Sequence, residues 1–387
     1  MFADRTQWTL TPNTLSRQLE RLRVKGVSVL DLTESNPTRV GLRYPEEILA
    51  SLTDPGALRY EPSPRGLRSA REAVASLFAS HKVSVDPDRI LLAAGTSEAY
   101  SFLFRLLMNP GDEVLIPQPS YPLFEYLAAL NDVKIVPYPL RFRGRWEIDL
   151  DRLAGAVSSK TGAVVLVHPN NPTGSCATRE ELQRIGLLCE KHQMALISDE
   201  VFAPYRTEMG SEKPWTLAGG SQALTFALGG LSKFMGLPQM KLAWIAATGS
   251  EPMVQEALGR LELIADTYLS VNTPVQLALP RWLALASEIQ SQIRERLLAN
   301  RRLLERTLSL TPGVQLLHSD GGWNGIVRAP LLQDEEAFVV RMLEEEHLLV
   351  HPGYFFDFEE PGFLVLSLLP APDLFEEGVN RLLRRLK

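Results

Sequence analysis

The stretch LGGLSKFMGLPQMKLAW, residues 228–244, sets the interpretation of the whole chain. Lys233 lies between glycines and apolar residues in a strand-then-turn setting, and a second cation, Lys241, follows eight positions later. Burial lowers the pKa of a lysine and leaves its amine neutral, which a Schiff-base lysine requires. An ordinary loop lysine is the alternative for this stretch taken alone.

The composition predicts a cytoplasmic enzyme that acts on small molecules. The chain has 387 residues, 45 % of them hydrophobic, which is enough for one large and one smaller domain. The net charge of −6 is not gathered into blocks, so we expect neither a nucleic acid nor a membrane as partner. Two cysteines without a CxxC pair favour a reducing compartment. No secretory leader and no apolar run of bilayer-spanning length is evident.

The order of the apolar segments predicts a three-layer α/β domain. Helical segments separate most of a series of short apolar runs, and this alternation is typical of a mostly parallel sheet covered on both faces. We expect seven strands, at residues 90–93, 113–116, 133–136, 163–167, 195–197, 223–228 and 242–247.

The remaining segments predict three parts of the chain. Residues 1–44 form an N-terminal segment that joins the small domain and covers the active site, residues 45–285 form the large domain, and residues 286–387 form a small α+β domain. A long helix from residue 274 to about 308 bridges the two domains. Further elements are expected as helices at 13–24, 67–80, 335–346 and 374–386, and as strands at 27–32, 314–317, 324–327 and 363–368.

The carboxyl ends of the predicted strands are where ligands bind in open parallel sheets, so we look for polar groups there. In AAGTSEAY, residues 93–100, a turn follows a strand and opens a helix. The backbone N–H groups of Gly95, Thr96 and Ser97 can therefore point at a phosphate, with the helix dipole behind them. An ordinary Ser/Thr helix cap is the alternative.

Three more strand ends carry candidate site residues. VVLVHPNNPTG, residues 164–174, places Asn171 in a turn after a buried strand, where its amide can donate a hydrogen bond or simply shape the turn. MALISDEVFAPY, residues 194–205, ends a strand at Asp199, which is either a buried acid that needs a cation or a solvated loop acid. Tyr121 in PQPSYP can stack on a flat ligand or belong to the core.

Together these motifs resemble the fold-type I, class I/II pyridoxal-phosphate-dependent aminotransferases of the aspartate aminotransferase superfamily. The resemblance covers nearly the whole chain, and NPTG and SK with DEV between them form its specific signal. It implies that Lys233 holds pyridoxal phosphate as a Schiff base and shuttles a proton, and that Asp199 pairs with the pyridinium nitrogen. It further implies cofactor binding by Gly95, Thr96, Ser97, Tyr121, Asn171, Lys241 and Tyr60.

The resemblance also implies the reaction and the assembly. An amino group would move between an amino acid and a 2-oxo acid through a pyridoxamine phosphate intermediate. Tyr60 matches a tyrosine that reaches the phosphate in the neighbouring subunit, so a homodimer with shared active sites is expected. Two alternatives stay open: a pyridoxal-phosphate-dependent β-lyase or decarboxylase on the same fold, and a non-catalytic effector-sensing domain.

Four positions depart from the family pattern. Lys241 stands where arginine is usual, Gly230 where a phosphate-binding serine is common, and Phe202 where a tyrosine donates to the phenolate. In GFLVLSLL, residues 362–369, Val365 stands where an arginine usually clamps the α-carboxylate of the substrate. Arg39 in the N-terminal loop is our candidate for a substitute, and a solvent-facing loop arginine is the alternative.

Overall fold

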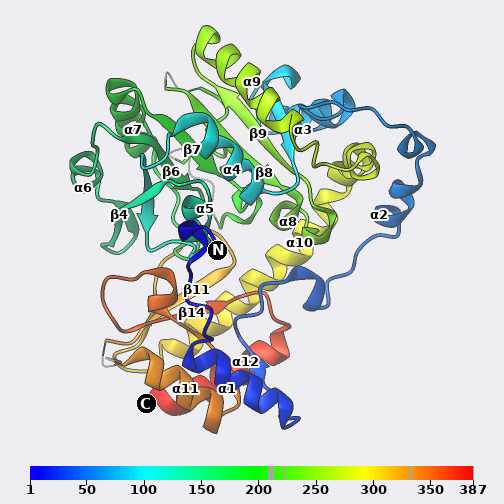
Figure 1. Ribbon diagram of the computed structural model, residues 1–387. Helices are drawn as coiled ribbons and strands as arrows, with labels where there is room; N and C mark the ends of the chain where they lie inside the picture. Colours follow the sequence, from blue (N-terminus) through cyan, green and yellow to red (C-terminus); the bar gives the residue numbers. More distant parts are fainter. Residues whose placement is uncertain (208–212, 221–222, 331, 333, 387) are drawn as a thin grey trace.

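The computed structural model describes residues 1–207, 213–220, 223–330, 332 and 334–386. It consists of two parts joined by the long helix α10 (Thr273–Leu308), which runs diagonally from one to the other in Figure 1. The upper part in that view holds a large sheet with helices around it, and the lower part holds a small sheet and both α1 (Thr14–Val24) and α12 (Pro372–Leu386).

The large sheet contains the seven predicted strands and an eighth, β5, at its edge. Strands β8, β7, β6, β3 and β4 are parallel neighbours, whereas β9 is antiparallel to both β8 and β2. The three-residue strand β5 is too short for its pattern to predict it, and its pairing extends β4 beyond the predicted end. The strand order is β2 (Ile90–Ala93), β9 (Ala243–Thr248), β8 (Thr225–Gly230), β7 (Ala195–Asp199), β6 (Thr161–Val167), β3 (Glu113–Gln118), β4 (Lys134–Phe142) and β5 (Trp146–Ile148).

Alternating residues of these strands pack into two helical layers. Ile197 faces a core shared with α4 (Thr96–Leu107), α5 (Leu123–Leu130) and α9 (Glu251–Asp266), and its neighbour Leu196 faces the opposite layer. That opposite layer contains α3 (Arg68–Ser80), α6 (Leu150–Gly155), α7 (Arg179–His192) and α10. Because both faces are covered, the strands are mostly apolar and their carboxyl ends form the accessible edge.

The small sheet is antiparallel, in the order β10 (Gln315–Leu316), β11 (Asn324–Arg328), β14 (Phe363–Ser367) and β13 (His351–Pro352). Leu364 and Leu366 of β14 pack on a core with α11 (Glu335–Glu345) and α12. A separate parallel pair joins β1 (Leu30–Asp31) to β12 (Leu348–Leu349), so the N-terminal segment is tied to this part. The predicted strand at 27–32 is therefore reduced to two residues.

Helix α10 has 36 residues and begins at the Asn272 cap, close to the predicted start. The expected domain boundary at 285/286 falls inside this continuous helix, so the division into 1–44, 45–285 and 286–387 stays a prediction. Over the described residues, no helix combines the length and the apolarity needed to cross a bilayer. The shorter helices are α2 (Glu47–Ala50), α8 (Leu231–Phe234), η1 (Asp4–Thr6), η2 (Pro37–Arg39), η3 (Ser51–Thr53), η4 (Pro55–Leu58), η5 (Pro87–Arg89), η6 (Ala203–Tyr205), η7 (Pro238–Met240) and η8 (Gly353–Phe356).

Candidate active site

The carboxyl-end edge of the large sheet gathers most of the predicted site residues. Strand β7 ends at Asp199, and β8 runs directly into the short helix α8, which carries Lys233. Strand β6 ends just before the turn that holds Asn171, and α4 begins after β2. Chain order therefore brings these side chains to one edge, because parallel strands end on the same side.

Asp199 is buried at this edge. The Tyr100 hydroxyl donates a hydrogen bond to Asp199 Oδ2 over 3.1 Å, and the backbone N–H of Val201 donates to Oδ1 over 3.2 Å. Burial nevertheless raises the pKa of Asp199 to about 6, because these bonds and the charge of Lys233 offset only part of the desolvation. An additional cationic partner would lower this pKa again and keep the carboxylate ionised below neutral pH as well.

Lys233 has a buried amine, and hydrogen bonds hold the backbone around it in place. Burial lowers the pKa of its amine, and the Asp199 carboxylate opposes part of that shift. The Tyr205 hydroxyl donates to the carbonyl oxygen of Lys233 over 2.7 Å, and Gln290 Nε2 donates to the carbonyl oxygen of Phe234 over 3.0 Å. The result is an anchored lysine with a lowered pKa, which suits a nucleophile or a base.

An aromatic cluster lies beside the Lys233 amine. Lys233 Nζ is 5.3 Å from the ring centroid of Trp323, which is only 2 % exposed. Phe202 and Tyr205 pack against the same indole ring, with centroid distances of 5.4 Å and 5.3 Å. A ring face stabilises an ammonium only weakly, so this contact moderates the effect of burial on Lys233 without reversing it.

The N-terminus of α4 forms a candidate phosphate cradle. Gly95 precedes the helix, and no side chain caps it there, so the N–H groups of Thr96 and Ser97 are available. A β-carbon built on Gly95 would lie 3.5 Å from Lys241 Nζ, which places this ammonium at the helix end. Within the described ranges Lys241 makes no ion pair. An uncapped helix N-terminus with an unpaired ammonium fits the phosphate of pyridoxal phosphate.

Asn171 is contacted from the small sheet. Asn324 Nδ2 donates a hydrogen bond to Asn171 Oδ1 over 2.9 Å. The preceding residue Asn170 serves the turn itself, because its Oδ1 accepts hydrogen bonds from the Thr173 hydroxyl at 2.9 Å and the Thr173 N–H at 3.3 Å. The amide nitrogen of Asn171 is thus left to donate elsewhere.

Three other predicted site residues lie at different depths. Tyr121 follows β3, and burial together with the charge of Asp199 raises the pKa of its phenol, so the ring lies near that carboxylate. Tyr60 is 79 % exposed on the surface of the single chain. The Arg39 side chain is 73 % exposed, and its Nη1 lies 3.9 Å from Glu34 Oε2. Tyr121 is itself 45 % exposed, so all three side chains reach the surface of the single chain, and of the three Tyr121 is the one influenced by the charge of Asp199.

Three of the four positions that depart from the family pattern are buried. A β-carbon on Gly230 would lie 3.0 Å from the β-carbon of Ala243, so a serine there needs β9 to shift. Phe202 is buried edge-on against Trp323, so its ring fills part of the aromatic cluster. Val365 is 1 % exposed and lies opposite Ile326 and His351 in the register of the small sheet.

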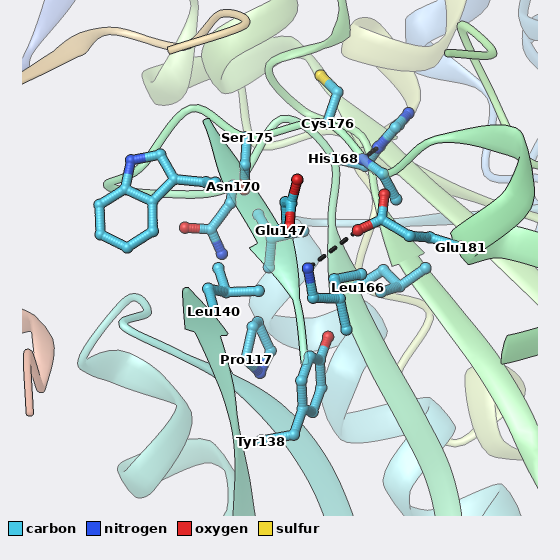
Figure 2. A pocket seen from close by; sticks show the side chains of 14 residues that line it. Pro117, Tyr138, Leu140, Glu147, Leu166, His168, Asn170, Ser175, Cys176 and Glu181 are labelled. Atoms are coloured by element: carbon cyan, nitrogen blue, oxygen red, sulfur yellow. Dashed lines mark hydrogen bonds between the residues drawn. The ribbon is translucent and has the colours of Figure 1, made fainter. Parts of the chain in front are cut away.

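A separate small pocket lies behind the turn that follows β6 (Figure 2). Asn170 and Ser175 of the turn line it together with Trp146 of β5. Asn170 Nδ2 and Trp146 Nε1 have no hydrogen-bond partner among the residues the structure describes. Neither Lys233 nor Asp199 lines this pocket, so it is distinct from the edge where the charged groups meet.

Sequence reasoning missed three residues of this site. Tyr100 contacts Asp199 across 99 positions of sequence, Asn324 begins β11 of the small sheet, and Trp323 lies in the bend directly before it. The glycine pair before Trp323 signals a close backbone approach, but no motif relates this segment to Lys233. Within the described residues, no group of three or more His, Cys, Asp and Glu side chains could hold a metal ion.

Comparison with known proteins identifies the family. The family model described as aminotransferase class I and II matches residues 28–386. The chain is 28 % identical to the glutamate-pyruvate aminotransferase AlaA of Haemophilus influenzae over 373 residues, which cover 94 % of this chain and 92 % of that protein. It is 29 % identical to the alanine aminotransferase of Mycobacterium tuberculosis, covering 94 % and 86 %.

Solved structures have the same fold. An alanine aminotransferase from Pyrococcus furiosus superimposes with a TM-score of 0.91 at 23 % identity, covering 100 % of this chain and 99 % of that one. An aminotransferase from Escherichia coli gives a TM-score of 0.88 at 25 % identity, covering 100 % and 98 %. The chain belongs to the class I and II aminotransferase family and is a pyridoxal-phosphate-dependent aminotransferase.

Proposed function

We propose that this aminotransferase works at the site formed by Lys233 and Asp199, with alanine and glutamate as the first amino donors to test. One observation carries the proposal: a buried amine and a buried carboxylate lie within electrostatic reach of each other at the strand ends. The names of the relatives, glutamate-pyruvate and alanine aminotransferase, support the choice of substrates.

The chain offers a partner for each polar part of the cofactor. Pyridoxal phosphate supplies an aldehyde that condenses with amines and a ring that accepts electrons. The α4 N-terminus and Lys241 would bind the phosphate, and Asp199 would pair with the ring nitrogen. A protonated ring nitrogen would be a cation that lowers the raised pKa of Asp199. Asn171 would donate to the phenolate oxygen, and Tyr121 would stack on the ring.

Lys233 would act as the proton carrier. Its lowered pKa leaves a larger fraction of the amine neutral near pH 7, so Nζ can accept a proton from the substrate carbon and return it. Tyr205 holds the backbone of Lys233, so the amine moves by its side chain alone. The face of the Trp323 ring would stabilise the amine by a cation–π contact while it is protonated.

Recognition of the substrate carboxylate would differ from that of relatives with an arginine at the Val365 position. Valine offers a carboxylate no hydrogen bond, so a cation elsewhere in the site would have to bind the substrate carboxylate. Arg39 is our candidate, and its loop follows β1, which is paired with β12 of the small domain. The exposure of Tyr60 supports a homodimer in which this tyrosine reaches the second site. Two buried, unpaired cysteines support a cytoplasmic location.

A half-reaction test addresses the proposed function directly. The purified protein, loaded with pyridoxal phosphate, is mixed with single amino acids while the absorbance of the bound chromophore is followed. We expect alanine or glutamate to bleach the visible band and the matching 2-oxo acid to restore it. A protein that releases ammonia or carbon dioxide over many turnovers, and whose visible band is kept or returns without any 2-oxo acid, would instead be a lyase or decarboxylase.

A further inference from the structure

The side chain of Asn324 crosses from the small sheet to the turn after β6. It is the first residue of β11, and its Nδ2 donates to Asn171 Oδ1 over 2.9 Å, although 153 positions separate the two residues. Among the described residues, the Asn171 side chain makes no other hydrogen bond. The direction in which the Asn171 amide points therefore depends on a residue outside its own turn.

An asparagine side chain has an acceptor on one branch and a donor on the other. Because Asn171 Oδ1 faces the Asn324 amide nitrogen, Asn171 Nδ2 is directed to the opposite side. Turning the Asn171 amide by 180° would set its NH₂ group against the NH₂ group of Asn324, which removes the hydrogen bond and places two donors together. With Asn324 in the orientation that the structure has, only one of the two Asn171 amide orientations makes the hydrogen bond.

The backbone around the two residues is packed closely enough to keep this contact in register. A β-carbon on Gly174 would lie 2.0 Å from Ser319 Oγ and 2.1 Å from the carbonyl oxygen of Gly321, so the turn and the segment before β11 are in direct contact. The Asp320 N–H also donates to the Gly174 carbonyl oxygen over 3.1 Å. These backbone contacts consequently fix the distance between the Asn324 and Asn171 backbones.

Two of the positions that depart from the family pattern offer no second donor for the same task. Phe202 is apolar and packs against Trp323, and Val365 presents only methyl groups on the small sheet. Resting on the proposed function, we propose that Asn324 is a positioning residue that aims the Asn171 Nδ2 donor at the phenolate oxygen of pyridoxal phosphate. Asn324 acts through Asn171 and needs no contact of its own with the cofactor.

The test is a pH titration of the absorbance of the enzyme-bound chromophore, together with the dissociation constant of pyridoxal phosphate for the cofactor-free protein. A hydrogen bond to the phenolate favours the deprotonated chromophore and lowers its titration midpoint. We expect Asn171→Ala and Asn324→Ala each to raise the midpoint, by on the order of half to one pH unit. The double variant should move it no further than Asn171→Ala alone, because both changes remove one donor.

Asn324→Asp sharpens the test, because aspartate has the shape of asparagine but no N–H to donate. Its carboxylate would accept from Asn171 Nδ2 and so turn the Asn171 oxygen toward the phenolate. We expect a larger rise of the midpoint for Asn324→Asp than for Asn324→Ala. This isosteric variant also keeps the measurement available if the alanine variant does not fold.

Asn300→Ala is the matched control. Asn300 Nδ2 donates to the carbonyl oxygens of Leu368 and Pro370 at 2.9 and 2.8 Å, so its loss weakens the small domain without touching Asn171. We expect a lower unfolding temperature and an unchanged midpoint. A midpoint that moves in Asn171→Ala but not in either Asn324 variant overturns the positioning role and leaves the proposed function intact. A midpoint unmoved by Asn171→Ala refutes the donor role itself, and the inference with it.

Discussion

The two sides of the site differ in what they present. On the large sheet, Lys233, Asp199 and the uncapped N-terminus of α4 place strong charges and free N–H groups at strand ends. On the small sheet, Val365 is apolar and Asn324 offers a neutral amide. If the proposed roles hold, cofactor binding depends on groups with few substitutes, whereas the small sheet offers a substrate carboxylate only weak contacts at these positions. Changes on the first side should therefore have the larger effects.

Lys233→Ala should have the largest effect of any single change. The variant loses both the covalent anchor and the proton carrier, so kcat for alanine with 2-oxoglutarate should fall by at least about 10⁴-fold. A coupled assay of pyruvate release measures this, and mass spectrometry after borohydride reduction locates the cofactor. Lys191→Ala, at an exposed position in the last turn of α7, is the control and should keep full activity. Substantial turnover by Lys233→Ala would place the site elsewhere.

Asp199→Asn tests the second strong charge. The amide cannot hold a protonated ring nitrogen, so kcat should fall by about 10²–10³-fold, the scale of losing one preorganised electrostatic partner. Tyr100→Phe removes only one hydrogen bond to the same carboxylate and should cost far less. A lower kcat for Asp199→Asn than for Tyr100→Phe is the expected result. Equal losses would mean that Asp199 acts through Tyr100 alone.

The same Asp199→Asn variant should stabilise the cofactor-free protein at high pH. Because burial raises the pKa of Asp199 from 3.8 to about 6, ionising it in the folded state costs stability. The contribution of the protonated acid is fully present below pH 3.8 and is lost as the pH rises through 6. The amide of the variant carries no such penalty, so at about pH 8 the unfolding free energy should rise by up to about 3 kcal/mol, fading toward about pH 4. Urea unfolding at both values checks this, and a pH-independent difference would contradict it.

The same contrast explains what the sequence predicts and what it leaves out. Lys233, Asp199, Asn171 and the Gly95 turn lie at the ends of apolar strands, so strand pattern and local motif are enough to place them on one edge. Strand β5 was not predicted, because three residues are too few to show an alternation of apolar and polar side chains. Its strand conformation comes from pairing with β4.

The missed residues are all defined by distant contacts. From the sequence pattern, Tyr100 is one of several core positions of the amphipathic helix α4. Its hydrogen bond to Asp199 depends on how α4 packs on the sheet. Trp323 and Asn324 approach the site only because the small sheet folds back against the large one. No local spacing encodes such an approach. Contacts between elements far apart in the chain are therefore the part that required the three-dimensional structure.

Arg39→Ala probes the substrate side at the position predicted from sequence. If Arg39 supplies the cation missing at Val365, its loss should raise the KM for alanine by about tenfold with little change in kcat, as expected for a single screened charge contact. Arg43→Ala is the matched control, because its side chain is exposed in the same loop and its backbone bonds to Gln292 are kept. Unchanged kinetics for Arg39→Ala would leave carboxylate recognition to groups other than this exposed arginine.

The smallest expected effect concerns Trp323, which lies where the two sides meet. Its ring face favours the protonated form of Lys233, so removing it should lower the pKa of that amine further. In Trp323→Leu, the acid limb of the pH profile of the alanine half-reaction should move down by about 0.4 to 0.7 pH units, equivalent to about 0.5–1 kcal/mol. Trp323→Phe keeps a ring face and should shift the limb less, although both variants lose buried volume and should unfold at lower temperature. Equal shifts in the two variants would assign the effect to altered packing, and an upward shift would show that the indole opposes protonation of Lys233.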